Sequence, residues 1–408
     1  MAEDDGQAGA APIFDVAIVG GGPVGLAMAA ALAHGVPGAR LALIEAGRAG
    51  SDPRASAIAA GVRNAFAAIG AWDAMAPEAN PIRSMKITDS GPDDLARPLF
   101  LDFSGDSVPG EPFAHMVPNG AVTASLEAIA GEALTRIAGR VAGLATAPGH
   151  AVLTLAEGDP VRARLVVAAD GGRSALREMA GISVFGHAYG QSGVVATIAH
   201  ELPHQDTAYE HFRPAGPFAS LPLRGDRSSL VWAERPERAE ALMGMDGPAV
   251  EREIEAAMGS TLGKVTLETP VRAFPLELRL ARRLTGERLA LVGDAAHVIH
   301  PIAGQGLNLG LRDVAALAEC VTDAMRMGMD PGVGEPLSRY ERWRLWDNAT
   351  MAAATDGLNR LFSNDAAPLR ALRDFGLSVV DRVGPLKSVF IARAAGASGP
   401  KLLRGVGL

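Results

Sequence analysis

The stretch Asp15-Val-Ala-Ile-Val-Gly20-Gly-Gly-Pro-Val-Gly25 decides the fold of this 408-residue chain. A short apolar run ends in glycine, and residues 23–33 follow as an alanine-rich helix. A second apolar run, residues 40–45, ends in an acid. Strand, glycine turn, helix and strand within about 30 residues predict a right-handed βαβ unit with two parallel strands.

The glycine turn fits G-x-G-x-x-G and predicts a dinucleotide site. Gly20 makes the tight turn, Gly22 lets a pyrophosphate approach the backbone, and Gly25 lets the helix pack closely on the strand. Pro23 opens the helix, whose free N–H groups attract the anion. Glu45, at the end of the second strand, is placed to accept hydrogen bonds from an adenosine ribose. The turn alone does not distinguish NAD from FAD.

Two later apolar strands also end in an acid. Residues 165–169 lead into Asp170-Gly171, and residues 289–293 lead into Asp294. The carboxyl ends of parallel strands form the edge at which open α/β sheets bind ligands, so we expect these acids at one site. A glycine-rich loop that opens a helix follows the second acid: His300-Pro301-Ile-Ala-Gly304-Gln305-Gly306-Leu307-Asn308.

Composition excludes several classes of function. The net charge of −8 argues against a nucleic-acid-binding protein, which needs a basic field to meet phosphates. The single cysteine, Cys320, excludes an internal disulfide, a cysteine-cluster metal site and a redox-active pair. The acidic N-terminus lacks a signal-peptide pattern, and glycine and proline interrupt the charge-free run 16–39. We therefore expect a cytoplasmic protein with no transmembrane helix and no metal.

Together these residues resemble the single-component flavoprotein aromatic hydroxylases, whose prototype is p-hydroxybenzoate hydroxylase. Three ordered motifs, 20–25, 170–177 and 293–308, carry the resemblance. It implies that FAD is the cofactor, that Glu45 and the glycine turn hold its ADP half, and that Asp294 holds the ribityl chain. The loop from Pro301 to Asn308 would then face the flavin ring.

Arg54 and Asn119 match positions at which this family places residues near the flavin. An exposed arginine and a loop asparagine are equally good interpretations of these two residues.

Five segments narrow the resemblance to the ubiquinone-biosynthesis ring hydroxylases: 208–222, 229–232, 295–313, 340–348 and 358–362. The implied reaction is reduction of FAD by NAD(P)H, addition of O₂ at flavin C4a, and attack of the hydroperoxide on the ring of a prenylated phenol. No second G-x-G-x-x-G follows a strand, so NAD(P)H is expected to be a transient co-substrate without its own domain.

Substrate and catalytic residues are harder to predict. A flavin hydroperoxide must be kept dry, so we expect an apolar substrate surface, with Val195, Thr197, Phe218 and Leu221 as candidates and core packing as the alternative. His297 and His300 flank the loop that begins at Pro301, and these three residues are the catalytic candidates. Either histidine could take a phenol proton, although a structural role is the alternative.

Two other functions fit the same residues. The first is a flavoprotein hydroxylase of a soluble aromatic acid, in which Arg213 or Arg224 would meet the carboxylate. The second is a non-catalytic, FAD-stabilised scaffold of a quinone-biosynthesis complex.

The predicted fold is mixed α/β, with three regions. Residues 1–84, 112–180 and 286–335 form a discontinuous Rossmann-like FAD-binding domain. The β-branched texture after residue 181 predicts an antiparallel substrate-binding sheet from residues 85–111 and 181–285. Residues 336–408 form a helical C-terminal region.

Charge is distributed unevenly along the chain. Residues 366–408 carry a net charge of +5, whereas the rest of the chain carries −13. Apolar residues at helical spacing accompany these basic residues. We therefore predict peripheral contact of 366–408 with the inner face of a membrane, with docking on the flavin domain as the alternative.

Overall fold

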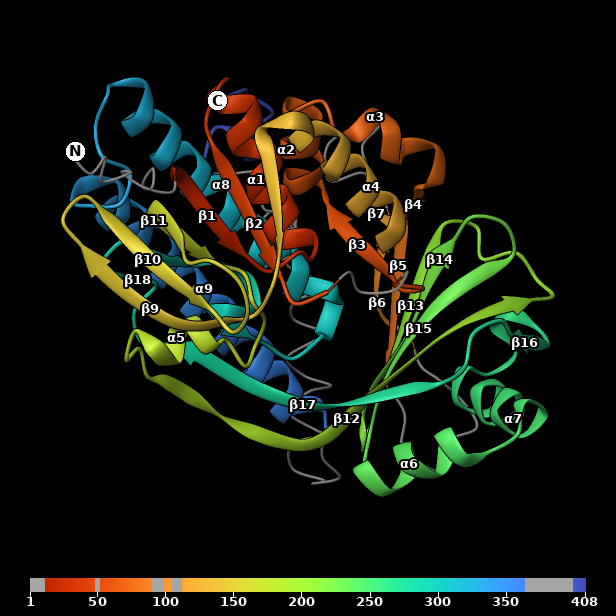
Figure 1. Ribbon diagram of the computed structural model, residues 1–408. Helices are drawn as coiled ribbons and strands as arrows, with labels where there is room; N and C mark the ends of the chain where they lie inside the picture. The colour runs from red at the N-terminus through yellow and green to blue at the C-terminus, as the bar shows by residue number, and fades with distance from the viewer. Residues whose placement is uncertain (1–11, 48–51, 90–98, 105–111, 364–398) are drawn as a thin grey trace, which may run out of the picture.

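The computed structural model describes residues 12–47, 52–89, 99–104, 112–363 and 399–408. Three β-sheets and a set of helices make up these residues (Figure 1). The mixed α/β fold predicted from the sequence is therefore confirmed.

The first sheet contains the predicted βαβ unit. β1 (Ile13–Val19) pairs in parallel with β2 (Leu41–Glu45), and α1 (Pro23–Gly35) connects the two strands. The strand order is β18-β19-β11-β1-β2-β8, with β10 and β9 attached beside β11. The other strands are β8 (Leu134–Ala138), β9 (Val141–Ala147), β10 (His150–Leu155), β11 (Val161–Ala168), β18 (Thr285–Gly286) and β19 (Leu289–Leu291).

Small and apolar side chains form the core around this sheet. Residues 16–19 of β1 and 165–168 of β11 are buried, and α1 presents a run of buried alanines that lets it lie close to the sheet. α1 packs against α4 (Asn119–Ala130) and α8 (Gln305–Arg326). The carboxyl ends of β1, β11 and β19 therefore meet at one edge, because these strands are parallel.

The second sheet is mostly antiparallel, with the order β20-β17-β12-β15-β14-β13-β5-β6. β12 (Val184–His200) and β17 (Arg272–Ala281) are long strands of this sheet that extend from the region near α5 (Ala175–Met179) to the rest of the sheet (Figure 1). The other strands are β5 (Ser84–Asp89), β6 (Leu99–Ser104), β13 (Thr207–Arg213), β14 (Gly216–Leu223), β15 (Arg227–Glu234), β16 (Val265–Leu267) and β20 (His297–Val298).

The second sheet has two different faces. Its outer face packs Phe218 and Trp232 against α6 (Pro236–Gly244) and α7 (Gly247–Met258). Its inner face packs Ala208 against the third sheet. Because side chains alternate along a strand, each residue of this sheet belongs to one face or the other.

The third sheet is small and lies between the two large sheets. It has the order β3-β7-β4, and Ala57 on β3 belongs to the same apolar cluster as Ala208 and Leu221. Its strands are β3 (Ala55–Ala59), β4 (Asn80–Ile82) and β7 (Ala114–Pro118). The remaining shorter helices are α2 (Ala60–Ala68), α3 (Trp72–Met75) and α5 (Ala175–Met179).

Two long helices, α8 and α9 (Glu335–Phe362), share a buried polar network. Asp313 on α8 accepts a hydrogen bond from Arg344 Nε at 2.7 Å, and its other oxygen lies 2.5 Å from His297 Nε2. Arg344 also pairs with Asp347, and Asn348 Nδ2 lies 3.3 Å from Asp313. This network joins both helices to the turn after β19.

Each large sheet takes its strands from separate segments of the chain. The first sheet takes strands from residues 13–45, 134–168 and 285–291, and the second from 84–104, 184–281 and 297–298. The exact domain bounds stay a prediction. Within the described part of the chain, no helix is both long and apolar enough to cross a membrane.

We expect Arg344→Met to lower the free energy of unfolding by about 3–5 kcal/mol, because it leaves the buried Asp313 carboxylate without the guanidinium that pairs with it. Arg342 is exposed on the same helix, and Arg342→Met should change stability by less than about 0.5 kcal/mol. Chemical unfolding of both variants, followed by circular dichroism, measures the difference. Equal stability of the two variants would contradict this account of the network.

The same network makes the stability of the folded protein depend on pH. Burial acts to raise the pKa of Asp313, but His297 and Arg344 lower it to about 2. The stabilisation is therefore fully present above the ordinary value of 3.8 and is lost as the pH falls through about 2. This loss should be smaller in Arg344→Met.

Candidate cofactor and substrate site

The three glycines of the first turn have different surroundings. A Cβ at Gly20, where φ is +116°, would lie 2.2 Å from the Ala169 carbonyl oxygen, and one at Gly25 would lie 1.9 Å from the Gly20 oxygen. A Cβ at Gly22 would meet no atom within 4 Å. Gly20 and Gly25 are therefore required by packing, whereas Gly22 borders open space at the N-terminus of α1, where Pro23 begins the helix.

Glu45 lies directly beside this turn, because a Cβ on Gly21 would be 2.0 Å from its Oε2. Arg136 Nη1 donates to Glu45 Oε1 at 2.6 Å, and Arg136 Nη2 donates to Glu127 at 2.6 Å. Arg136 was not foreseen, since it lies on β8 and only the pairing of β8 with β2 brings it to Glu45. The pair fixes the acid next to the glycine turn.

The acids Asp170 and Asp294 follow β11 and β19 at the same sheet edge. Asp170 Oδ2 accepts from Leu176 N at 3.2 Å, while its buried Oδ1 has no hydrogen-bond partner among the described residues. Asp294 is exposed, yet desolvation by the surrounding protein raises its pKa, against the opposite effects of His297 and Arg54. An acid that is both open to solvent and desolvated lies in a recess.

Arg177 joins the two acid-bearing turns. Its Nη1 donates to the Ala295 carbonyl at 2.9 Å and its Nη2 to the Gly172 carbonyl at 3.0 Å. The side chain is buried, and Ser174 Oγ accepts a hydrogen bond from Arg177 N at 3.0 Å. Sequence reasoning missed this residue, although the serine three positions earlier is an N-cap signal for the short helix that carries it.

The glycine-rich loop forms a short 3₁₀ turn, Ile302–Gly304, immediately after Pro301, and α8 begins at Gln305. Asn308 Oδ1 accepts from Ala59 N at 2.8 Å, and its Nδ2 donates to the Ala57 carbonyl at 2.7 Å. The Asn308 side chain thus ties the loop to β3. Any contact of Asn308 with a flavin would come through its backbone.

Two further residues of this loop, Gly306 and Leu307, have different surroundings. A Cβ on Gly306 would meet nothing within 4 Å, so the backbone there is open to a ligand. Leu307 is partly buried against the first core, and Gly171 in the first acid turn also borders open space.

Arg54 and Asn119 share one carboxylate, that of Asp52. Arg54 Nε and Nη2 donate to Asp52 at 2.9 and 2.8 Å, and Asn119 Nδ2 donates at 2.7 Å. Burial acts to raise the pKa of Asp52, but the hydrogen bonds from Arg54 and Asn119 lower it to about 2. The charge of Asp294 also acts on Arg54. The structure therefore brings Arg54 and Asn119 together on Asp52.

The two histidines have different environments. His297 is buried and bonded to Asp313, within the network beneath the loop. His300 is fully buried, and its two ring nitrogens have no hydrogen-bond partner among the described residues. Its ring meets the Tyr189 ring edge-on, with 5.0 Å between the ring centroids. Burial lowers the pKa of His300 to about 4, so its ring is neutral at pH 7. A proton-transfer role for either histidine stays a prediction.

The predicted substrate residues lie on two faces of the second sheet. Val195 pairs with Val231, and Thr197 pairs with Ser229, which in turn pairs with Leu221, so these three candidates share the inner face. Phe218 instead packs against Trp232 in the core of the outer face. Phe218 and Leu221 are three positions apart on one strand, so they point in opposite directions and Phe218 does not line the inner face.

Arg213 and Arg224, the two candidates for binding the carboxylate of an aromatic acid, also lie away from the inner face. The Arg213 guanidinium stands 5.2 Å from the Trp232 ring on the outer face and 3.5 Å from Glu234. Arg224 is exposed in the turn after β14.

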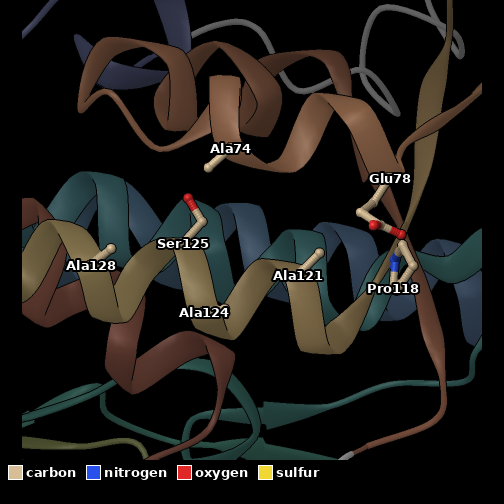
Figure 2. Close-up of a pocket in the computed structure, with 7 residues that line it drawn as sticks. All are labelled: Ala74, Glu78, Pro118, Ala121, Ala124, Ser125 and Ala128. Atoms are coloured by element: carbon tan, nitrogen blue, oxygen red, sulfur yellow. The ribbon is translucent and has the colours of Figure 1, made fainter.

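A pocket of about 410 Å³ lies apart from these residues, between α4 and the segment from α3 to Glu78 (Figure 2). Alanines make up most of its lining, with Glu78, Pro118 and Ser125. The Ser125 hydroxyl is already donated to the Ala71 carbonyl at 2.6 Å. The pocket therefore offers little to hold a dinucleotide. Among the described residues, no cluster of three potential ligands for a metal ion occurs.

The recess at the sheet edge fits a dinucleotide with a long polar chain. It combines open space at Gly22, an oriented acid at Glu45, and acids at 170 and 294 that retain free acceptor oxygens. Anions suit the helix N-terminus, and hydroxyl groups suit the acids.

Comparisons with known proteins agree with this geometry. The family model described as an FAD binding domain matches residues 14–344. The chain is 43% identical to ubiquinone hydroxylase UbiL of Rhodospirillum rubrum, over 97% of this chain and 94% of that protein. It is 37% identical to 3-demethoxyubiquinol 3-hydroxylase of Escherichia coli (94% and 98%) and 32% identical to mouse mitochondrial ubiquinone biosynthesis monooxygenase COQ6 (94% and 91%).

Among solved structures, p-nitrophenol 4-monooxygenase PnpA from Pseudomonas putida matches with a TM-score of 0.77 at 19% identity, covering 95% of this chain and 99% of that one. This similarity concerns the fold. The family match and the relatives confirm the resemblance seen in the sequence. The chain therefore belongs to the family of FAD-dependent monooxygenases that includes the ubiquinone ring hydroxylases, and FAD is its cofactor.

Proposed function

We propose that this enzyme hydroxylates the aromatic ring of a prenylated phenol in ubiquinone biosynthesis, with NAD(P)H and O₂ as co-substrates. The observation that carries the proposal is its similarity to three ubiquinone ring hydroxylases along at least 94% of its length.

We assign the cofactor contacts as follows. The backbone at Gly22 and the N-terminus of α1 would bind the pyrophosphate, Glu45 the adenosine ribose, and Asp294 the ribityl chain. The loop 301–308 would face the flavin ring, where the N-terminus of the 22-residue α8 favours negative charge. When bound, FAD supplies the electrons that activate O₂.

The rest of the chain positions and shields the substrate. The inner face of the second sheet presents apolar side chains such as Val195 and Leu221, which are half-buried, with Leu221 also in the apolar cluster of Ala208. Such a surface suits a prenylated ring and keeps water away from the reacting atoms.

The placement of the arginines favours a neutral phenol over an aromatic acid. Arg213 lies on the outer face and Arg224 in an exposed turn, so neither supplies the buried cation that a carboxylate would need on the inner face.

Membrane contact of 366–408 and membership of a quinone-biosynthesis complex stay predictions. Residues 364–398 lie outside the described residues. In the described end of this segment, Leu402 and Leu403 are buried in the first core, and Lys401 Nζ lies 3.6 Å from Asp323. This end of the segment packs against the core around the first sheet.

The function is tested with the purified FAD-bound enzyme, a short-chain prenylated phenol and NAD(P)H. We expect substrate-stimulated NAD(P)H oxidation matched by a product that is heavier by one oxygen atom in mass spectrometry. A benzoic acid with the same ring substituents should give neither signal. Hydroxylation of the acid alone would overturn the proposed substrate, and no product from either compound would point to the scaffold role.

Gly22→Val should abolish FAD binding and leave the apoprotein folded. A Cβ at this position meets no protein atom within 4 Å, so the valine extends into the space assigned to the pyrophosphate. Flavin absorbance of the purified variant measures the effect, and the Tm of the FAD-free protein serves as the control. In Gly25→Ala, by contrast, the Cβ would lie against the Gly20 carbonyl, so the apoprotein itself should be less stable. A Gly22→Val protein with stoichiometric FAD would refute the assignment.

Asp294→Ala should weaken FAD binding by about 1.5–3 kcal/mol, the contribution of a hydrogen bond to a charged group. Fluorescence titration of the apoprotein with FAD gives the Kd. Glu287 is an exposed acid in the turn before β19, and Glu287→Ala should leave the Kd unchanged. If the two variants bind FAD equally well, Asp294 does not hold the ribityl chain.

A further inference from the structure

A buried carboxyl group lies on the inner face of the second sheet without a partner. Glu210, on β13, is 6% exposed. No hydrogen bond or ion pair joins it to any residue that the structure describes, whereas the buried Asp313 has several. A buried charge normally requires a partner, so an unpaired carboxyl calls for a ligand or a proton.

The strand register fixes where Glu210 points. Glu210 pairs with Ala219, Ala219 with Val231, and Val231 with Val195, so the four side chains form one row across the sheet. The adjacent row contains Leu221 and Thr197. Glu210 is therefore the acid within the surface assigned to the substrate ring.

This row lies close to the loop 301–308, which we assign to the flavin ring. Ala208, two positions before Glu210 on the same face, packs in one cluster with Ala57 of β3. Asn308 of the loop bonds to the Ala57 carbonyl. One strand thus separates the loop from the surface that carries Glu210.

Burial raises the pKa of Glu210 to about 7, and no charged group contributes to the shift. On β13 itself, the neighbouring His211 points to the outer face, where its ring is 2.7 Å from Thr88. On the adjoining strands, Ile87 and Ala219 stand opposite Glu210 and do not titrate. The group can therefore exchange a proton near neutral pH without a competing charge.

We propose that Glu210 binds the phenolic hydroxyl of the substrate and accepts its proton during ring hydroxylation. This inference rests on the proposed function. The phenol O–H bond breaks, the proton moves to a Glu210 carboxylate oxygen, and the electron pair stays on the phenol oxygen. The ring thereby gains electron density at the carbon that receives the hydroxyl group. That carbon then bonds to the oxygen atom that O₂ and the reduced cofactor supply, and its hydrogen leaves as a proton to water. Glu210 finally returns its own proton to the phenol oxygen.

The two histidines are less suited to this step. His297 is occupied by Asp313, and His300 has a pKa of about 4, which makes it a weak acceptor. A carboxyl group with a pKa close to 7 is ionised often enough to act and basic enough to hold the proton.

Ligand binding tests the proposal without turnover. The probe is a neutral prenylated phenol added to the FAD-bound enzyme in the absence of NAD(P)H. Above its pKa, Glu210 is a carboxylate and accepts a stronger hydrogen bond, so the Kd should fall about 5–10-fold between about pH 6 and about pH 8.5. The phenol itself stays neutral in this range, since its pKa is about 10.

Two comparisons isolate the carboxyl group. In Glu210→Gln, which keeps the shape, the Kd should not vary with pH. The methyl ether of the same phenol has no hydroxyl proton to donate. Its Kd for the wild-type enzyme should therefore stay the same as the pH rises. Loss of an unpaired buried carboxyl does not break a contact within the described structure, so the variant should fold and retain FAD.

Turnover gives the second measurement. Glu210→Gln should form hydroxylated product at least about 100-fold more slowly, and its rate should lose the rise near pH 7. Glu240→Gln makes the same change at an exposed position of α6 and should match the wild type. A pH-independent Kd in the wild type, or an unchanged pH profile in Glu210→Gln, would overturn the role of Glu210. Failure of the wild type to hydroxylate any phenol would overturn the proposed function, and the binding data would still judge Glu210.

Discussion

The fully buried carboxylate of Asp313 is the constraint on which the cofactor site depends. It accepts hydrogen bonds from the Gly293 backbone at 3.1 Å, from His297 and from Arg344. These three partners come from the turn after β19, from β20 and from α9, so one side chain sets the position of Asp294 and of the loop that follows it. An ion this deeply buried is stable only with its complete set of partners, and it therefore favours one arrangement of these segments.

Polar groups in this protein fall into two classes. Most buried ones, such as Arg177 and Asn308, have their donors occupied by backbone carbonyls and act as scaffold. Others have a polar atom without a hydrogen-bond partner among the described residues, including Asp170 Oδ1, His115 Nδ1, Ser220 Oγ and both ring nitrogens of His300. Glu210 likewise has no partner among the described residues. Since an unpaired buried polar group costs free energy, its presence is explained most simply by a ligand that completes it. Of these groups, Asp170 lies at the sheet edge assigned to the cofactor, and Glu210 lies on the face assigned to the substrate.

Sequence motifs predicted the βαβ unit, the acids at the sheet edge and the glycine-rich loop, because each depends on neighbours along the chain. They could not predict Arg136, which reaches Glu45 only because β8 pairs with β2. The alternation rule alone could have excluded Phe218 once its strand bounds were known, since residues an odd number of positions apart face opposite ways. In the sequence, Glu210 is one residue of the segment 208–222. Only its burial and the strand register show that it is an unpaired carboxyl on the inner face.

β20 has a structural role that crosses the boundary between cofactor and substrate regions. Its two residues, His297 and Val298, pair with Leu280 and Arg279 of β17, so the segment that follows Asp294 is itself an edge strand of the second sheet. The two large regions thus share backbone hydrogen bonds and cannot be exchanged as independent modules. A chimaera that took residues 181–285 from a relative would replace β17 and leave β20 facing a foreign edge. Changing ring specificity by recombination therefore requires crossover points that keep β17 and β20 from the same parent.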